Sequence, residues 1–286
     1  ASEVYKRQGV VDTHAYDGSV NFSAGAAVPN QVLFRQTRRY FRYQSGKGIQ
    51  FSTGTILKPQ IAFTLLSSVG VTVTVTCKMP HSLTANTFVK VSGFDQTAYN
   101  GTFKIQSVPN LLTFTYTALT VPTPTSATST VPSTPPVSPS SWYGAGSRFG
   151  LLDNQNGILF YFDGIQLYAG LRNSVNQITG TVSVTNASSL VTGSSTQFST
   201  QLIVGDFIVI RGQSYRVLSI TSDTQLFITP EYRGVTISNA LVSRTIDVLV
   251  PQSQWYDPCD GTGPSGYNLD LTRVQMFYLD YSWYGA

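Results

Sequence analysis

Residues that usually carry catalysis are scarce in this chain. Among 286 residues there are two His, two Cys and 14 Asp plus Glu. His14 stands in a segment of small polar residues and His81 in a Pro-His-Ser-Leu turn, so neither has a nucleophile held beside it by a recognisable motif. Zinc-type spacings such as Cys-x-x-Cys are also missing from the sequence. We therefore expect no enzymatic activity, no cofactor and no transition-metal site.

Two loops carry enough oxygen atoms to consider calcium as a ligand. The residues are Asp257, Asp260 and Asp270 in one loop, and Asp153, Asn154 and Asn156 in the other. Calcium prefers several carboxylate and carbonyl ligands from flexible loops. Asp and Asn in Gly-rich turns, however, usually accept hydrogen bonds from their own backbone. We expect ordinary turns at both places and keep calcium as the alternative.

A glycosidase needs two acids that face each other across a cleft. The chain has only Glu3 and Glu231 besides Asp residues in turn-like sequences, so we do not expect an enzyme that degrades polysaccharide. Aromatic rings on strands can hold a glycan without cutting it. The candidate contacts of this kind are Trp142, Tyr143, Tyr161 and Tyr168. The alternative is that these rings belong to the core or to a subunit interface.

Basic residues concentrate in one short segment, although the net charge of +4 and the pI near 9.0 are mild. The candidate subunit-interface residues there are Arg35, Arg38, Arg39, Tyr40, Arg42 and Tyr43. Guanidinium groups among tyrosines can stack on the rings and bind an acidic partner. Proteins that bind nucleic acid normally carry basic residues along a whole face, so we do not expect nucleic acid as a partner.

The composition indicates an all-β protein. Charged residues make up 11% of the chain, against roughly 25% in ordinary soluble domains. The 16 Tyr and 16 Phe, with abundant Val, Thr, Ser and Gly, suit pleated sheets and tight turns. No run of about 20 apolar residues is present, so we expect no membrane-spanning segment. A surface so poor in charge predicts extensive cover by neighbouring subunits.

The order of strand and turn signals predicts a jelly-roll-like β-sandwich with two inserted small β-barrel-like modules. The predicted parts are an extended N-terminal arm (1–32), a discontinuous sandwich (33–69, 142–177 and 243–286), a first module (70–120), a Pro/Ser/Thr-rich linker (121–141) and a second module (178–242). The prolines of the linker favour an extended tether or a strap that lies on the domain.

Within the predicted sandwich, residues 147–172 contain three strand runs. The turns between them are 153–157 and the Asp163-Gly164 pair, which is typical of a hairpin. The C-terminal run 273–283 alternates with apolar residues on both faces, so we expect this strand to be covered on both sides.

The two predicted modules are similar in sequence plan. Three strand runs of the first can be set beside three of the second, in the same order and with the same turns (88–93 and 207–212, 103–108 and 215–220, 112–115 and 226–229). This pattern predicts an internal duplication.

Several motifs resemble those of virion structural proteins from tailed bacteriophages, including phages of cyanobacteria. An Asp-x-x-Asp-Gly-Thr-Gly-Pro-Ser-Gly run from Asp257 leads into a strand that ends Asp-x-x-Trp-x-Gly at Gly285. The segments 79–83, 89–93 and 99–103, and likewise 192–196 with 204–208, are similar to repeats of phage tail and bacterial surface proteins. The Arg-Phe-Gly, Asn-Gly-Ile and Asp-Gly spacing of 148–164 is similar to concanavalin-like jelly rolls.

The resemblance implies a non-enzymatic structural component of the virion, assembled in the host cytoplasm, and we expect it in the tail, baseplate or fibre-attachment region. Its expected partners are other copies of itself and other virion proteins. Two alternatives remain: an adhesin that recognises a host surface glycan, and a capsid decoration or cement protein.

Overall fold

The computed structural model describes residues 2–6, 10–13, 20–23, 33–37, 41, 47–58, 60–78, 80, 81, 83–127, 137–140 and 146–282. Every strand pair among these residues is antiparallel. Helical structure in them is confined to α1 (Phe198–Gln201), η1 (Thr97–Tyr99) and η2 (Gln252–Gln254). The predicted all-β class of sandwich type is confirmed. Within the described ranges, no helix has the length and apolar character needed to cross a membrane.

The chain divides into two compact units. The first contains residues 1–145, 163–165 and 269–286, and the second contains 146–162 and 166–268. Each unit combines one predicted module with part of the predicted sandwich. The jelly-roll strand order and the proposed domain division therefore stay predictions.

Three two-stranded sheets belong to the first unit. They pair β1 (Ser2–Lys6) with β4 (Leu33–Thr37), β2 (Val10–Thr13) with β3 (Val20–Ser23), and β5 (Ile49–Thr55) with β22 (Gln275–Tyr281). Three short strands thus lie in the segment predicted to be an extended arm. One of them, β1, is anchored along β4.

The C-terminal strand β22 is covered on one face only, and the expectation of two covered faces is wrong. Gln275 and Phe277 are buried, whereas Met276 is 72% and Tyr278 is 54% exposed. The reason is that β22 pairs with β5 in a two-stranded ribbon, so its alternate side chains point to opposite faces and one set stays in solvent.

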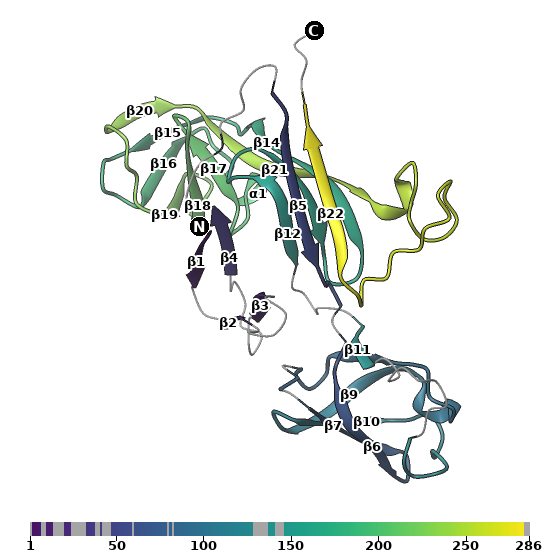
Figure 1. Cartoon of the computed structure of the whole chain (residues 1–286). Helices are drawn as coiled ribbons and strands as arrows, with labels where there is room; N and C mark the ends of the chain where they lie inside the picture. The colour runs from purple at the N-terminus through teal and green to yellow at the C-terminus, as the bar shows by residue number, and fades with distance from the viewer. Residues whose placement is uncertain are drawn as a thin grey trace. The chain divides into compact units, whose positions relative to one another are not determined.

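The first unit also contains a six-stranded sheet, which we call module 1. Its strand order is β11-β8-β9-β10-β7-β6, and the sheet curves around its own core (Figure 1). The strands are β6 (Phe63–Val69), β7 (Thr72–Cys77), β8 (Phe88–Val91), β9 (Gly101–Asn110), β10 (Thr113–Thr117) and β11 (Val137–Pro139). The core includes Val75, Val89, Phe103, Phe114 and Tyr116.

Module 1 extends beyond the predicted boundaries 70–120 at both ends. Strand β6 forms a hairpin with β7 through Gly70, whose φ of +59° suits glycine, so a boundary at 69/70 would cut this hairpin. Strand β11 pairs with β8 and lies at the edge of the sheet, where Pro139 is tolerated because an edge strand leaves backbone positions unpaired. The end of the predicted linker thus behaves as a strap on the module.

The second unit is built on one ten-stranded sheet with the order β12-β13-β14-β21-β17-β18-β19-β16-β15-β20. Its strands are β12 (Ser147–Leu152), β13 (Gly157–Phe162), β14 (Leu167–Gln177), β15 (Thr181–Val184), β16 (Leu190–Ser194), β17 (Phe207–Ile210), β18 (Gln213–Ser222), β19 (Gln225–Thr229), β20 (Ile237–Ala240) and β21 (Val242–Pro251). The meander β12, β13 and β14 has the two predicted turns.

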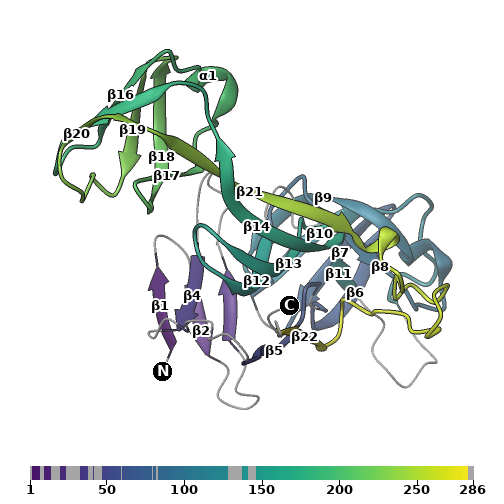
Figure 2. The same cartoon turned by 90° about the horizontal axis from the view of Figure 1, so that it is seen from above.

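The long strands β14 and β21 connect the two parts of this unit, as Figure 2 shows. Together with β12 and β13 they form what we call the four-stranded part. Beyond a bulge in the β14–β21 pairing between Asn173 and Asn176, β21 pairs with β17 and enters module 2, which comprises β15 to β20 and the start of β21. Module 2 has a separate core that includes Val191, Ile208, Tyr215, Val217 and Tyr232.

The two modules share one strand plan, which confirms the predicted duplication. The order β21-β17-β18-β19-β16-β15 repeats β11-β8-β9-β10-β7-β6 strand for strand. In module 1, Asn86 N donates to Ile105 O at 2.9 Å and Ile105 N to Thr87 O at 2.8 Å. Matching bonds in module 2 join Gly205 N to Val217 O at 2.9 Å and Val217 N to Asp206 O at 2.8 Å.

Candidate binding surfaces

The predicted basic interface segment is described only in part. Arg35 lies on β4, opposite Val4 of β1, and its side chain is exposed. The other predicted members, Arg38, Arg39, Tyr40, Arg42 and Tyr43, lie outside the described residues. Their role at a subunit interface therefore stays a prediction.

Two of the four predicted glycan contacts meet on the four-stranded part. Tyr161 on β13 and Tyr168 on β14 are cross-strand partners, and their ring centroids lie 5.8 Å apart at an interplanar angle of 30°. The structure brings them together because antiparallel pairing places opposed side chains on the same face. The remaining two, Trp142 and Tyr143, lie outside the described residues.

A guanidinium group already occupies one ring of this pair. The Arg148 side chain lies over Tyr161, with its central carbon 4.3 Å from the ring centroid. Arg148 also reaches Asp247, with 2.9 Å between Nε and Oδ2. Because this cation–π contact covers one face of the Tyr161 ring, the pair resembles a supported packing element more than an open sugar platform.

Asp247 on β21 is the centre of an ionic cluster on the same face. Arg172 Nε lies 2.8 Å from Asp247 Oδ1 and Arg172 Nη2 lies 3.1 Å from Oδ2, which is a two-point contact. Arg172 Nη1 also donates to the carbonyl of Asp153 at 3.0 Å. Burial acts to raise the pKa of Asp247, but the hydrogen bonds and charges of Arg172 and Arg148 outweigh it and hold this pKa below its ordinary value. The cluster ties β12, β14 and β21 together.

The opposite face of the four-stranded part is apolar over its two central cross-strand rows, and the flanking rows include Ser147 and Asn173. Strand alternation and register place eight uncharged residues on it, namely Phe149, Leu151, Ile158, Phe160, Ala169, Leu171, Val248 and Val250. We call this set the apolar face. Leu171, Val248 and Val250 are 53%, 52% and 41% exposed. Sequence reasoning predicted three of these strands as a meander but did not predict which of their faces would be exposed, because alternation alone does not distinguish a buried face from an exposed one.

An aromatic row supports the apolar face. The Phe149 and Phe160 rings lie 5.8 Å apart, and the Trp255 ring lies 6.1 Å from that of Phe160. Trp255 is fixed by a hydrogen bond from its Nε1 to the carbonyl oxygen of Val250, at 3.0 Å. These ring contacts and this hydrogen bond therefore hold the side chains of the face in place.

The two candidate calcium loops use their carboxylates for their own turns. Asp257 accepts the backbone N–H groups of Cys259 and Ser265, each at 3.0 Å. The hydrogen bonds of Ser265, followed by that of the Cys259 backbone, lower the pKa of Asp257. Asp153 likewise accepts from the backbone of Gln155 and Asn156. Over the described ranges, no group of three His, Cys, Asp or Glu side chains could hold a metal ion.

His81 sits in module 1 as a packing residue. Its Nδ1 accepts the backbone N–H of Leu83 at 3.0 Å, and its ring meets the Phe114 ring edge-on at 5.2 Å. Burial lowers the pKa of His81, which favours the neutral imidazole. This environment suits a structural histidine.

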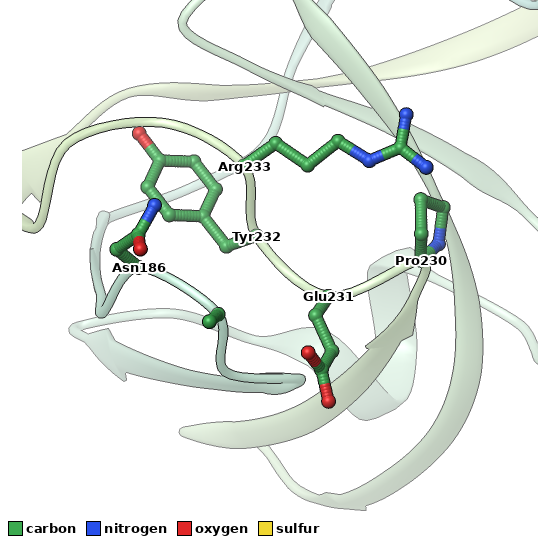
Figure 3. A pocket seen from close by; sticks show the side chains of 6 residues that line it. Asn186, Pro230, Glu231, Tyr232 and Arg233 are labelled. Atoms are coloured by element: carbon green, nitrogen blue, oxygen red, sulfur yellow. The ribbon is translucent and has the colours of Figure 1, made fainter.

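Sequence reasoning missed a pair of hollows at one end of module 2. A shallow pocket of about 580 Å³ is lined by Asn186, Ala187, Pro230, Glu231, Tyr232 and Arg233 (Figure 3). A second, of about 390 Å³, shares Tyr232 and lies along residues 210–213 and 234–237. The signal that could have found them is the run Pro230-Glu-Tyr-Arg-Gly234, which places two opposite charges in a turn between strands.

Comparison with known proteins gives no family for this chain. No known protein family, no curated protein and no solved structure matches it.

Proposed function

We propose that this protein is a non-enzymatic structural subunit of a tailed phage virion, which assembles with further copies of itself through the apolar face of its four-stranded part. The observation that carries the assembly proposal is the exposure of Leu171, Val248 and Val250, at 53%, 52% and 41%. Contiguous apolar surface of this kind marks a protein interaction site on a water-soluble protein.

The size of the apolar face indicates what else the interface needs. Four strands spaced about 4.8 Å apart and some 20 Å long present roughly 400 Å². A stable interface buries about 800 Å² on each partner. The face would thus supply about half, and we propose that the basic segment around Arg35 or the N-terminal arm supplies further area.

A second copy of the chain is the occupant we favour. The apolar face has no charged residue among its eight positions, so it gives a partner no charge pattern to match. A self-complementary contact around a symmetry axis needs only that the same patch pack against itself or against an adjacent edge. Strand β12 lies at the end of its sheet, so the edge next to the face is available for such a contact.

The virion part of the proposal is supported by the resemblance of the Asp257 to Gly285 segment to phage structural proteins. Assignment to the tail, baseplate or fibre-attachment region belongs to the same proposal. Antibodies raised against the purified chain, applied to particles of a phage whose genome encodes it, would place it by immuno-electron microscopy. Labelling of the tail supports the assignment, labelling over the capsid surface supports a decoration protein, and particles without label would refute a virion role.

Sedimentation velocity over micromolar to millimolar concentrations tests the assembly. We expect the unmodified chain to form a discrete oligomer and Val248→Asp to shift it to the monomer, because a buried unpaired carboxylate is strongly unfavourable. Leu218→Asp is the matched control, since Leu218 is 57% exposed on β18 in module 2. An unmodified chain that stays monomeric, or equal effects of the two substitutions, would overturn the assembly proposal.

A further inference from the structure

The duplicated modules differ in charge at one shared end. In module 1, the β6–β7 turn meets the segment after β10, where Ala118 N donates to Val71 O at 2.8 Å. In module 2, the β15–β16 turn meets the segment after β19, where Ala187 N donates to Tyr232 O at 2.8 Å. The same pair of connections thus forms this end of both modules.

At this end, module 2 presents charged side chains, whereas the described residues 69–72 and 117–121 of module 1 carry none. The large exposed residues of module 1 there are aliphatic, with Val69 at 87%, Leu119 at 90% and Val121 at 58%, and module 2 also exposes one aliphatic residue, Val235, at 86%. The corresponding end of module 2 presents Glu231 and Arg233 around the larger pocket. Because both modules have the same strand plan and only module 2 has charged residues at this end, the fold itself does not require those charges.

The loop that carries these charges is held rigidly. Asn186 Nδ2 donates to Gly234 O at 2.9 Å, and the Asn186 backbone N–H donates to Thr236 Oγ1 at 3.0 Å. Arg233 donates its backbone N–H to the hydroxyl of the buried Tyr215 at 3.2 Å. Tyr232 is 2% exposed and anchors the loop in the core. The pocket is therefore preformed, as ligand sites usually are.

The charged groups themselves remain available to a ligand. Among the described residues, neither Glu231 nor Arg233 makes a side-chain hydrogen bond or ion pair, and both are exposed. Figure 3 shows the two side chains extending from the loop in different directions, with Asn186 on the neighbouring turn. They can approach different groups of one ligand.

We propose that this end of module 2 is a binding site for a neutral saccharide. A carboxylate only accepts hydrogen bonds and a guanidinium only donates them, while the Asn186 amide retains a free acceptor oxygen. A ligand that satisfies all three must offer donors and acceptors on adjacent atoms, which is what neighbouring hydroxyl groups do. Glu231 and Arg233 offset each other in the larger pocket, and Arg211 of the second hollow adds one further positive charge. This balance disfavours a basic ligand, while the Glu231 carboxylate repels a polyanion, and the heparin comparison below separates a neutral from an acidic saccharide.

The second hollow extends the site along the chain of a saccharide. It shares Tyr232 with the first and is lined further by residues 234–237 of the same loop. Arg211 and Gln213 add further hydrogen-bonding groups there. Two adjoining hollows suit consecutive units of a linear polymer better than one isolated sugar. This inference does not depend on the proposed assembly through the apolar face.

Isothermal titration calorimetry of the full chain tests the site. The probes are short neutral oligosaccharides of glucose, mannose or galactose, with heparin as an anionic comparison. Glu231→Gln and Arg233→Gln should each weaken binding by about tenfold or more, because each removes a charge-assisted hydrogen bond. Leu119→Ser, at the matching end of module 1, should leave binding unchanged. Both pocket residues are exposed, so these variants should fold normally, and their thermal unfolding checks this.

Two results would overturn the saccharide site. One is that none of the neutral oligosaccharides binds, or that binding is insensitive to both pocket substitutions. The other is that only heparin binds and that Arg233→Gln alone abolishes it, which would indicate a simple anion site. Sedimentation of the same samples separates this outcome from a failure of assembly, since the oligomer does not require Glu231 or Arg233.

Discussion

Arg172 and Asp247 form a two-point ion pair across β14 and β21, with contacts of 2.8 and 3.1 Å, and both side chains are nearly buried. Asp247→Asn would leave the Arg172 guanidinium without its countercharge in a site that is largely shielded from solvent. We expect it to lower the free energy of unfolding of the second unit by about 2–4 kcal/mol. Arg148→Gln is the comparison, and because Arg148 is 41% exposed it should cost less than about 1 kcal/mol. Urea denaturation would measure both, followed by Trp255 fluorescence in a chain whose other two tryptophans, Trp142 and Trp283, are replaced by Phe.

The same ion pair predicts a loss of stability in acid. The pKa of Asp247 lies below its ordinary value of 3.8 in the folded protein, because the arginines outweigh the effect of burial. Its contribution is therefore complete above pH 3.8 and disappears as the pH falls through the lower folded-state pKa. Unfolding curves recorded on both sides of this range should show a steeper acid loss for the unmodified chain than for Asp247→Asn. Parallel curves would contradict the role of Asp247.

His81 predicts a second pH effect, in module 1. Burial lowers the pKa of His81 from 6.5, although the nearby backbone carbonyls of Thr113 and Asn110 partly oppose this shift. Among the described residues, the buried His81 Nε2 has no hydrogen-bond partner at normal geometry. The folded module thus prefers neutral histidine, so stability is highest above pH 6.5 and falls as the pH drops toward the folded-state pKa.

Amide NMR signals of β9 and β10, followed during thermal unfolding at high and low pH, would measure this effect. His81→Gln should remove most of the pH dependence within this range. If the variant retains the full dependence, another group titrates instead.

The matched turns of the two modules predict which residues position 205 accepts. Gly205 has φ +100°, and its counterpart Asn86 has φ +70°. Only the Arg216 side chain would lie within 4 Å of an added Cβ at Gly205, so backbone strain decides the cost. We expect Gly205→Asn to cost less than about 1 kcal/mol and Gly205→Val about 2 kcal/mol, because β-branched residues avoid this region. Equal losses in urea denaturation would refute the equivalence of the turns.

The two free cysteines should differ in reactivity. Cys77 is 3% exposed, and burial raises its pKa to about 11. The pKa of Cys259 is also raised, by partial burial and by the charge of Asp257, but Cys259 is only half-buried and a reagent can reach it. Since the thiolate is the reactive form, a thiol reagent at mildly alkaline pH should modify Cys259 first and Cys77 only on unfolding. Cys259→Ser should abolish the native reaction. Rapid modification of two thiols in the native chain would show that module 1 opens readily.

The duplication was predictable from sequence because its signals are local. Alternation and Gly turns around Phe88 and Phe207 were enough to match the strands, and the strand order confirms the match. The extent of module 1 was not predictable in the same way. Strand β11 pairs with β8, which lies far back in the chain, and nothing local to Val137 specifies that partner.

The candidate surfaces likewise include features that local sequence predicts and features that depend on distant segments. Tyr161 and Tyr168 were named from sequence only as candidate glycan contacts, and this role stays a prediction. Their pairing follows from the predicted hairpin, but the Arg148 contact over Tyr161 depends on a side-chain conformation that the sequence does not encode locally. The pocket at Glu231 arises where two distant connections meet, so its lining could not be assembled from one segment. Whether the apolar face is exposed depends on which other segments pack against it, and the sequence of these strands does not specify those segments.

Cryo-electron microscopy of the concentrated, purified chain tests the central proposal most directly. Assembly predicts an ordered oligomer in which Leu171, Val248 and Val250 are buried between subunits and Trp255 lines the same contact. An oligomer that leaves these residues in solvent, or a chain that remains monomeric at every concentration, would contradict it.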